Sequence, residues 1–276
     1  MNQPVHLPSS SAPQRIGQGT AVEQSRAAAE VQAAVVVAQQ CPRNIQTAVA
    51  EMRESCKQMT LAERAFYRYP KGGQTITGAS VHLARELARC WGNLQYGLVE
   101  MRRDDDYGQS EMQAFAWDVQ TNSRNSSTFI VPHRRDTKDG PKQVTDMRDI
   151  YELNTNNGSR RVREAIFAIL PPWFVEEAKD ICNQTLKNGG GKPLAQRIAD
   201  AIKVFEGLGV TTDRIEARFE RDSGKWTEHD VAQLLVIYKS IQRGEITVED
   251  EFPAPRVSAD ELIGASKPKP ADAVAK

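Results

Sequence analysis

The stretch DMRDIYELNTNNGSRRVREAIFAIL, residues 146–170, has the pattern of a long amphipathic helix. Its apolar residues recur at the i, i+3, i+4, i+7, i+8 spacing that defines one helical face, and they are Val162, Ala165, Ile166, Ile169 and Leu170. Extended backward, this face takes in Gly158, Thr155 and Tyr151. We therefore expect the helix to begin near Asp146 or Asp149, whose negative charge suits a helix N-terminus.

Three arginines, Arg160, Arg161 and Arg163, lie in the middle of this predicted helix. On a helical wheel Arg161 and Arg163 flank the apolar face on opposite sides, and Arg160 points away from it. Two interpretations stay open. The planar guanidinium forks suit phosphate oxygens, with nearby asparagines as further donors; alternatively, the helix face is solvated and Arg160 pairs with Glu164 at i, i+4.

Three strand-like runs precede the helix: NLQYGLVEMRR (93–103), SEMQAFAWDVQ (110–120) and SSTFIVP (126–132). The turn-forming stretches DDDYGQ and TNSRN separate them, which predicts a three-stranded antiparallel meander. In the middle run Phe115 and Trp117 alternate with Met112, Ala114 and Ala116. Because both sets are apolar, we expect a central strand with both faces covered and with Phe115 and Trp117 inside.

Further elements are expected upstream of the meander. AFYRYPKGGQTITG (65–78) has the pattern of a short hairpin, and SVHLARELARCWGN (80–93) that of a helix capped by Thr77 or Ser80 and ended by Gly92. Ala-rich sequence from 21 to 59 predicts two helices broken at Pro42, interpreted as packing or assembly helices.

The rest of the chain is expected to be helical or disordered. A helix is predicted after Pro171 and Pro172, and KNGGGKP (187–193) is predicted to be a linker. Residues 194–251 have the pattern of a bundle of three short helices, one of which starts at Thr227. Residues 1–20 and 252–276, rich in Ser, Pro, Ala and Lys, are interpreted as disordered tails. The predicted class is therefore α+β.

Bulk properties exclude several classes of protein. The 276-residue chain has a formal net charge of zero, so a site for a polyanion depends on local clustering of charge. Its four cysteines are scattered without metal-ligand spacing, which favours a reduced, cytoplasmic protein without a metal. The start lacks the pattern of a secretory signal, and no apolar run is long enough for a membrane span.

Local clustering of charge does occur between residues 124 and 164, which contain nine Lys and Arg residues and six acids. The polar loop HRRDTKDGPKQ (133–143) either closes over a phosphate backbone or is a solvated turn. The aromatic residues near the strands are either stacking platforms for unpaired bases or core. Besides the three helix arginines, the candidate contacts are His133, Arg134, Arg135, Lys138, Lys142, Arg148, Asn154, Tyr67, Tyr69 and Lys71.

Catalytic motifs are absent. GxxxxGK[ST], GxSxG and HExxH do not occur, so no cofactor is expected. A Mg²⁺-dependent nuclease remains an alternative, because clustered carboxylates can hold the metal ion in such enzymes. The acids it would use are Asp104, Asp106, Glu111 and Asp118. The strand after the acidic run has no lysine or histidine to assist catalysis, and DDDYG is typical of a solvated turn.

The chain resembles the phage single-strand annealing proteins of the RecT, Redβ and Erf type over about residues 60–186. The resemblance rests on the order of four elements: the capped helix GASVHLARELARCWGN, the meander, the basic loop and the helix NGSRRVREAIF. The resemblance implies a β-β-β-α core, a basic groove for single-stranded DNA, and assembly into rings or helical filaments. The family's basic helix positions match Arg160 and Arg161 best. A third falls on Glu164, one residue from Arg163.

The resemblance also implies roles for the parts of the chain. Residues 21–186 would anneal single-stranded DNA and form the homo-oligomer. Residues 194–251 would dock a companion exonuclease or a host single-strand binding protein. The sequence thus predicts an ATP-independent annealing protein of phage-type recombination. The nuclease and a phage assembly or adaptor protein that does not bind DNA are the alternatives.

Overall fold

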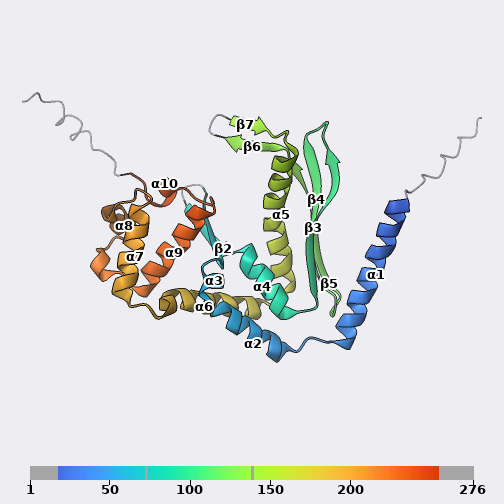
Figure 1. The fold of residues 1–276 in the computed structure, drawn as a ribbon, viewed down its shortest axis with the longest axis horizontal. Helices are drawn as coiled ribbons and strands as arrows, with labels where there is room; N and C mark the ends of the chain where they lie inside the picture. Colours follow the sequence, from blue (N-terminus) through green and yellow to red (C-terminus); the bar gives the residue numbers. More distant parts are fainter. Residues whose placement is uncertain (1–17, 72–73, 138–139, 255–276) are drawn as a thin grey trace, which may run out of the picture.

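The computed structural model describes residues 18–71, 74–137 and 140–254. The fold is α+β, as predicted, with a small antiparallel sheet and helices along most of the remaining chain (Figure 1). None of the helices in these three ranges combines the length and the apolar character needed to cross a membrane.

The main sheet is a meander of β3 (Leu94–Asp104), β4 (Gln109–Asp118) and β5 (Ser123–Pro132). The strand order is β3-β4-β5, which confirms that β4 is central. Leu98 pairs with Ala114, and Ala114 pairs with Ser127. A bulge between Glu100 and Arg102 shifts the register near the end of β3.

Helix α5 (Met147–Ile169) packs on one face of this sheet. The side chain of Asp146 accepts hydrogen bonds from the amides of Arg148 and Asp149, so the helix begins where the sequence predicts. At Gly158 the helix approaches β3 closely, because a Cβ there would lie 2.2 Å from Cδ2 of Leu98. The glycine allows the helix and the sheet to meet.

The other face of the sheet is open. Met112, Ala114 and Ala116 of β4 are buried on the α5 side, whereas Phe115 and Trp117 are only half-buried on the opposite side. The prediction that both faces are covered and both rings lie inside is therefore wrong. The helices that pack on the sheet most extensively, α5 and α4 (Val81–Trp91), share one face of it.

The main core lies between that covered face and a helical layer. Helices α2 (Ile45–Cys56), α3 (Met59–Ala62) and α6 (Pro172–Asn188) join α4 and α5 there. Ser80 caps α4, Gly92 follows its end with a φ of 70°, and Pro172 begins α6.

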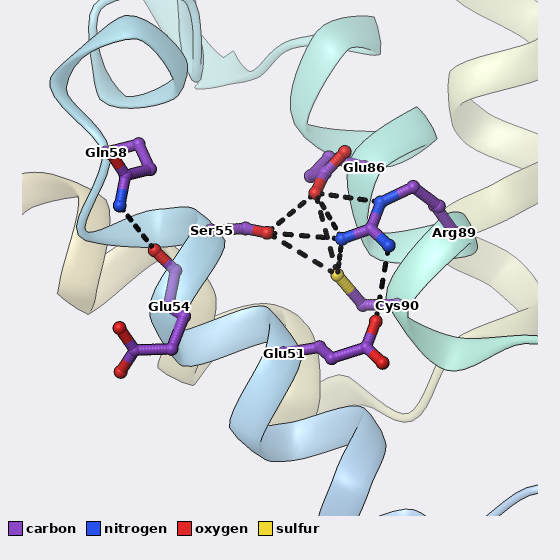
Figure 2. A network of polar contacts seen from close by, with 7 residues as sticks. All are labelled: Glu51, Glu54, Ser55, Gln58, Glu86, Arg89 and Cys90. Carbon is purple, nitrogen blue, oxygen red and sulfur yellow. Dashed lines mark hydrogen bonds and ion pairs between the residues drawn. The ribbon is translucent and has the colours of Figure 1, made fainter.

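A polar network crosses the surface between α2 and α4 (Figure 2). Ser55 Oγ donates to Glu86 over 2.7 Å, and Arg89 donates to Glu86 over 2.9 Å and to Glu51 over 3.2 Å. Exposed pairs of this kind contribute up to about 1 kcal/mol each. The two helices are therefore held mainly by the buried apolar side chains beneath the network.

Helix α1 (Gln18–Gln40) ends before Pro42, which confirms the predicted break between two helices. The segment after it is fixed to the sheet, because Arg43 Nη2 forms a buried ion pair with Asp118 at 2.9 Å and Arg43 Nε donates to the carbonyl of Trp91 at 2.6 Å. The helix itself stands apart from the rest of the molecule (Figure 1).

Two hairpins complete the N-terminal part. Strands β1 (Phe66–Lys71) and β2 (Gln74–Ala79) form the predicted hairpin. Strands β6 (Arg134–Thr137) and β7 (Gly140–Gln143) form a second one, where an irregular loop was expected. The polar composition of 133–143 concealed this hairpin because both of its strands are largely solvated.

The C-terminal part contains η1 (Gly189–Gly191), α7 (Leu194–Glu206), α8 (Thr212–Phe219), η2 (Ser223–Lys225), α9 (Glu228–Gln242) and α10 (Val248–Glu251). Thr227 caps α9 in a reciprocal capping box with Asp230. The predicted C-terminal tail begins too early, because the ring of Phe252 is fully buried against Phe205, 5.1 Å between ring centres. Residues 1–17 and 255–276 of the predicted tails lie outside the described ranges.

This helical part is attached to the N-terminal part at several points. Helix α9 contributes Ala232 and Val236 to the main core and Leu234 and Ile237 to a second core. The predicted linker is held as well, since Arg197 donates to the carbonyl of Leu186 at 2.7 Å. Arg68 of β1 donates to Glu251 and to Gln233, which joins the β1–β2 hairpin to the bundle.

Candidate nucleic-acid interface

A groove of about 690 Å³ lies between the β1–β2 hairpin, the start of α4, strand β5 and helix α5. Five of the residues predicted as DNA contacts line it, namely Tyr67, Arg134, Arg160, Arg161 and Arg163. They come from β1, β6 and α5, three elements far apart in the sequence.

The helix α5 presents its arginines to two different walls of the groove. Arg161 lies over the ring of Phe129 on β5, 5.9 Å from the ring centre, and Arg163 lies over Tyr67 on β1 at 4.5 Å. The buried face of α5 carries Val162 between them. The two arginines therefore flank the apolar face, as the helical wheel predicted.

The Tyr67 ring supports an arginine. Gly78 on the paired strand leaves the space that the ring occupies, since a Cβ there would lie 2.7 Å from the Tyr67 hydroxyl. The Arg163 side chain is 17% exposed, so the ring and the groove walls restrict its motion. A guanidinium held in this way presents a flat donor surface.

The charge of the groove is positive. Five arginines and two glutamates line it. Arg68 is already paired with the buried Glu251 at 3.2 Å, and Glu245 with Arg243 at 2.8 Å. Glu164 lies 3.1 Å from Arg161 and 3.8 Å from Arg163. Arg134 and Arg160 are exposed and form no ion pair with any described residue.

The N-terminus of α4 forms part of the groove wall through Ser80, Val81 and His82. This end carries the partial positive charge of the helix dipole. The His82 side chain is exposed at the groove wall, and its partial loss of hydration there, followed by the nearby Arg243 and Arg64, lowers its pKa from 6.5. His82 is therefore mainly uncharged at neutral pH.

Two predicted contacts are buried below the groove and are wrong as DNA contacts. His133 is 2% exposed, and its Nε2 lies 2.8 Å from Ser110 Oγ. Asn154 donates to Ser110 Oγ over 3.0 Å and to Glu100 over 3.2 Å. Because Asn154 precedes Gly158 by one helical turn, it faces the sheet, and the cluster links β4, the end of β5 and α5.

Three other predicted contacts do not line the groove. Arg135, Lys142 and Arg148 are exposed on the β6–β7 hairpin and at the start of α5, and Arg135 lies 3.7 Å from Asp149. Tyr69 and Lys71 belong to β1, but their side chains are outside the described part of the structure, as is Lys138.

Phe129, Asn157 and His82 also line the groove but are not among the predicted contacts, although Asn157 is one of the nearby asparagines that the sequence offers as further donors. Asn157 had a usable signal, because it precedes Arg161 by one helical turn. His82 follows the capping Ser80 by two residues, which places it in the first turn of α4. Phe129 was considered only as one of several aromatic residues near the strands.

The acids proposed for the nuclease do not gather. Asp118 lies at one end of β4 and pairs with Arg43, whereas Glu111 lies near the other end. Asp104 pairs with Arg102 at 3.0 Å. Across the described ranges, no group of three or more His, Cys, Asp or Glu residues is arranged to hold a metal ion.

No protein-family model, curated protein or solved structure matches the chain.

Proposed function

We propose that the protein binds single-stranded DNA along the groove and anneals complementary strands without ATP, as a homo-oligomer in phage-type homologous recombination. The observation that carries the proposal is the gathering of Arg134, Arg160, Arg161 and Arg163 in one groove beside Tyr67 and Phe129. Arginine forks suit phosphate oxygens, and guanidinium planes and rings suit unpaired bases.

The length of the groove supports a small site in each subunit. The groove-lining part of α5 runs from Leu153 to Glu164, which is about 17 Å at 1.5 Å per residue. At a spacing of about 3.4 Å per nucleotide, this span accommodates roughly five nucleotides. An oligomer would repeat the site along one strand, which strengthens binding without a large net charge on the chain.

The order of the elements supports the same proposal. A meander with a long helix packed across one face agrees with the β-β-β-α order that the resemblance implies, although the β6–β7 hairpin lies between β5 and α5 in the chain. The groove lies beside β5 and α5. We propose that the C-terminal bundle docks a companion exonuclease or a host single-strand binding protein. Its contact with the β1–β2 hairpin would keep that partner near the DNA.

The variant Arg160→Ala/Arg161→Ala tests the groove as the binding site. We expect it to fold and to bind a single-stranded oligonucleotide roughly tenfold more weakly or worse, because two charge-assisted contacts are lost. The plot of log affinity against log salt should become shallower by about 1.4, at roughly 0.7 per phosphate contact. Fluorescence anisotropy over a range of salt concentrations measures both quantities.

A matched control is Lys57→Ala/Lys225→Ala, which also removes two positive charges. Both lysines are exposed and lie outside the groove. For this variant the slope of log affinity against log salt should stay close to the wild-type slope, because neither lysine would contact DNA in the groove. Equal weakening of binding by both variants would show that total charge, and not the groove, determines DNA binding.

A further inference from the structure

Helix α1 carries a long apolar surface that its own chain does not cover. From Val31 to Gln40 it contains no charged residue, yet Ala38 is the only side chain among those described in α1 that is buried. Val31 is 42%, Val36 47% and Val37 55% exposed. An uncharged helix surface rich in valine and alanine is normally covered by another element, and most helices in proteins owe their stability to such packing.

The open face of the meander is a second uncovered surface. Its two central cross-strand rows are Gly97, Phe115 and Ser126, followed by Val99, Gln113 and Thr128. Neither row contains a charged residue, but the guanidinium of Arg124, from the row of Trp117, lies over the Phe115 ring at 5.9 Å and would have to share the face with a partner. Val99 is 42% exposed, and Ile130 in the next row is 58% exposed. The ring of Phe115 covers Gly97, where a Cβ would lie 2.8 Å from the ring.

The uncharged parts of these two surfaces agree in length. On the open face the charged rows are Trp117 with Arg124 at one end and Glu111 with Arg102 at the other. These rows are six positions apart on β4, about 20 Å at 3.4 Å per residue. The uncharged stretch of α1, ten residues long, measures about 15 Å and fits between them. Its charged pair, Arg26 and Glu30, lies beyond that stretch.

The segment that follows α1 is anchored at one end of the sheet. Arg43 fixes the segment after α1 through Asp118, Trp91 and Gly92, and α1 is one continuous helix from Gln18 to Gln40. In the monomer α1 stands on the open side of the sheet but separate from it (Figure 1). The valines of both surfaces consequently remain exposed.

We infer that α1 of one subunit packs on the open face of the meander of a second copy of this chain. Each copy then offers one helix and one receiving face. Because these are different surfaces, the contact is head-to-tail, and repeating it builds a ring or a filament. This interface forms without DNA and does not depend on the groove residues.

Two full-length variants test this inference. Val36→Glu/Val37→Glu places charge on the helix and leaves the receiving face intact, whereas Val99→Glu/Thr128→Glu places charge on the face and leaves the helix intact. Sedimentation equilibrium without DNA should give an assembly for the wild type and a monomer for each variant. An equimolar mixture of the variants should give a dimer, because one intact helix then meets one intact face.

A matched control is Val204→Glu/Leu208→Glu, which adds the same charges to exposed apolar positions of α7 and its end. It should assemble like the wild type. Three results would overturn the inference. They are a monomeric wild type, a mixture of the two variants that stays monomeric, and assembly of Val99→Glu/Thr128→Glu in the absence of the other variant. If the wild type is monomeric and only the face variant loses affinity for single-stranded DNA, the face binds bases instead of α1.

Discussion

Two asparagines on α5 show how a single helical position separates a structural residue from a groove residue. Asn154 is buried and bonded to Ser110 and Glu100, whereas Asn157, three residues later, lines the groove. The apolar face of α5 is visible in the sequence, and Asn154 lies one turn before Gly158 on that face. Its role was predictable from the helical period, but polar residue type was given more weight than position.

His133 has a weaker signal, because it continues the alternate positions Phe129 and Val131 of β5, which face the covered side of the sheet. It follows β5 within a run of polar residues, where solvent exposure is the ordinary expectation. Its burial depends on Ser110, which lies on the neighbouring strand opposite Val131. Only the folded arrangement of β4, β5 and α5 brings these side chains together.

At the residue scale, His82 makes stability depend on pH. Partial loss of hydration at the groove wall and the nearby arginines lower its pKa in the folded state from 6.5, although the side chain is still exposed. Above 6.5 the imidazole is neutral in both states and has no effect. As the pH falls below 6.5 the unfolded chain binds the proton first, so the free energy of unfolding decreases until the pH reaches the folded-state pKa.

The variant His82→Gln lacks this loss of stability. Urea unfolding of both proteins at about pH 8 and about pH 5.5 isolates the effect, because the other titrating groups are shared. We expect the stability of the wild type relative to the variant to be lower at the acidic pH. A difference that is independent of pH would show that His82 titrates normally in the folded protein.

At the scale of elements, the contact between α5 and β3 rests on Gly158. In Gly158→Ala the new Cβ would overlap Leu98, and forcing the helix away from the sheet should cost about 1–3 kcal/mol despite the better helix propensity of alanine. Chemical denaturation measures this cost. Asn156→Ala, at an exposed position of the same helix, should change stability by less than about 0.5 kcal/mol.

A double-mutant cycle separates overlap from a general effect on the helix. Leu98→Ala removes the side chain that the new Cβ would meet. Leu98→Ala/Gly158→Ala should therefore be more stable than the sum of the single changes predicts, by at least about 0.5 kcal/mol. Simple additivity would contradict the close approach of α5 and β3.

Elements with a strong local signal were predictable from the sequence. The spacing of apolar residues and the caps at Asp146, Ser80 and Thr227 identified α5, α4 and α9. The open face of the meander was not predictable, because Phe115 and Trp117 are apolar whether or not another element covers them. Deciding between the two cases requires knowing where every helix lies.

At the scale of the whole molecule, the groove depends on contacts between distant parts of the chain. The β1–β2 hairpin forms one wall, and Arg68 in this hairpin is bonded to Glu251 and Gln233 of the C-terminal bundle. Helix α9 also belongs to both cores. The sequence places a boundary at 187–193, but it does not show that the two sides of this boundary pack together.

The central claim is that the whole protein anneals strands through its groove. The most direct measurement follows two complementary single strands, labelled as an energy-transfer pair, in Mg²⁺ without ATP, and then determines strand length on a denaturing gel. We predict faster pairing with the wild type, full-length strands afterward, and a rate at least roughly tenfold slower with Arg160→Ala/Arg161→Ala. Shortened strands, or equal acceleration by the wild type and the variant, would contradict the claim.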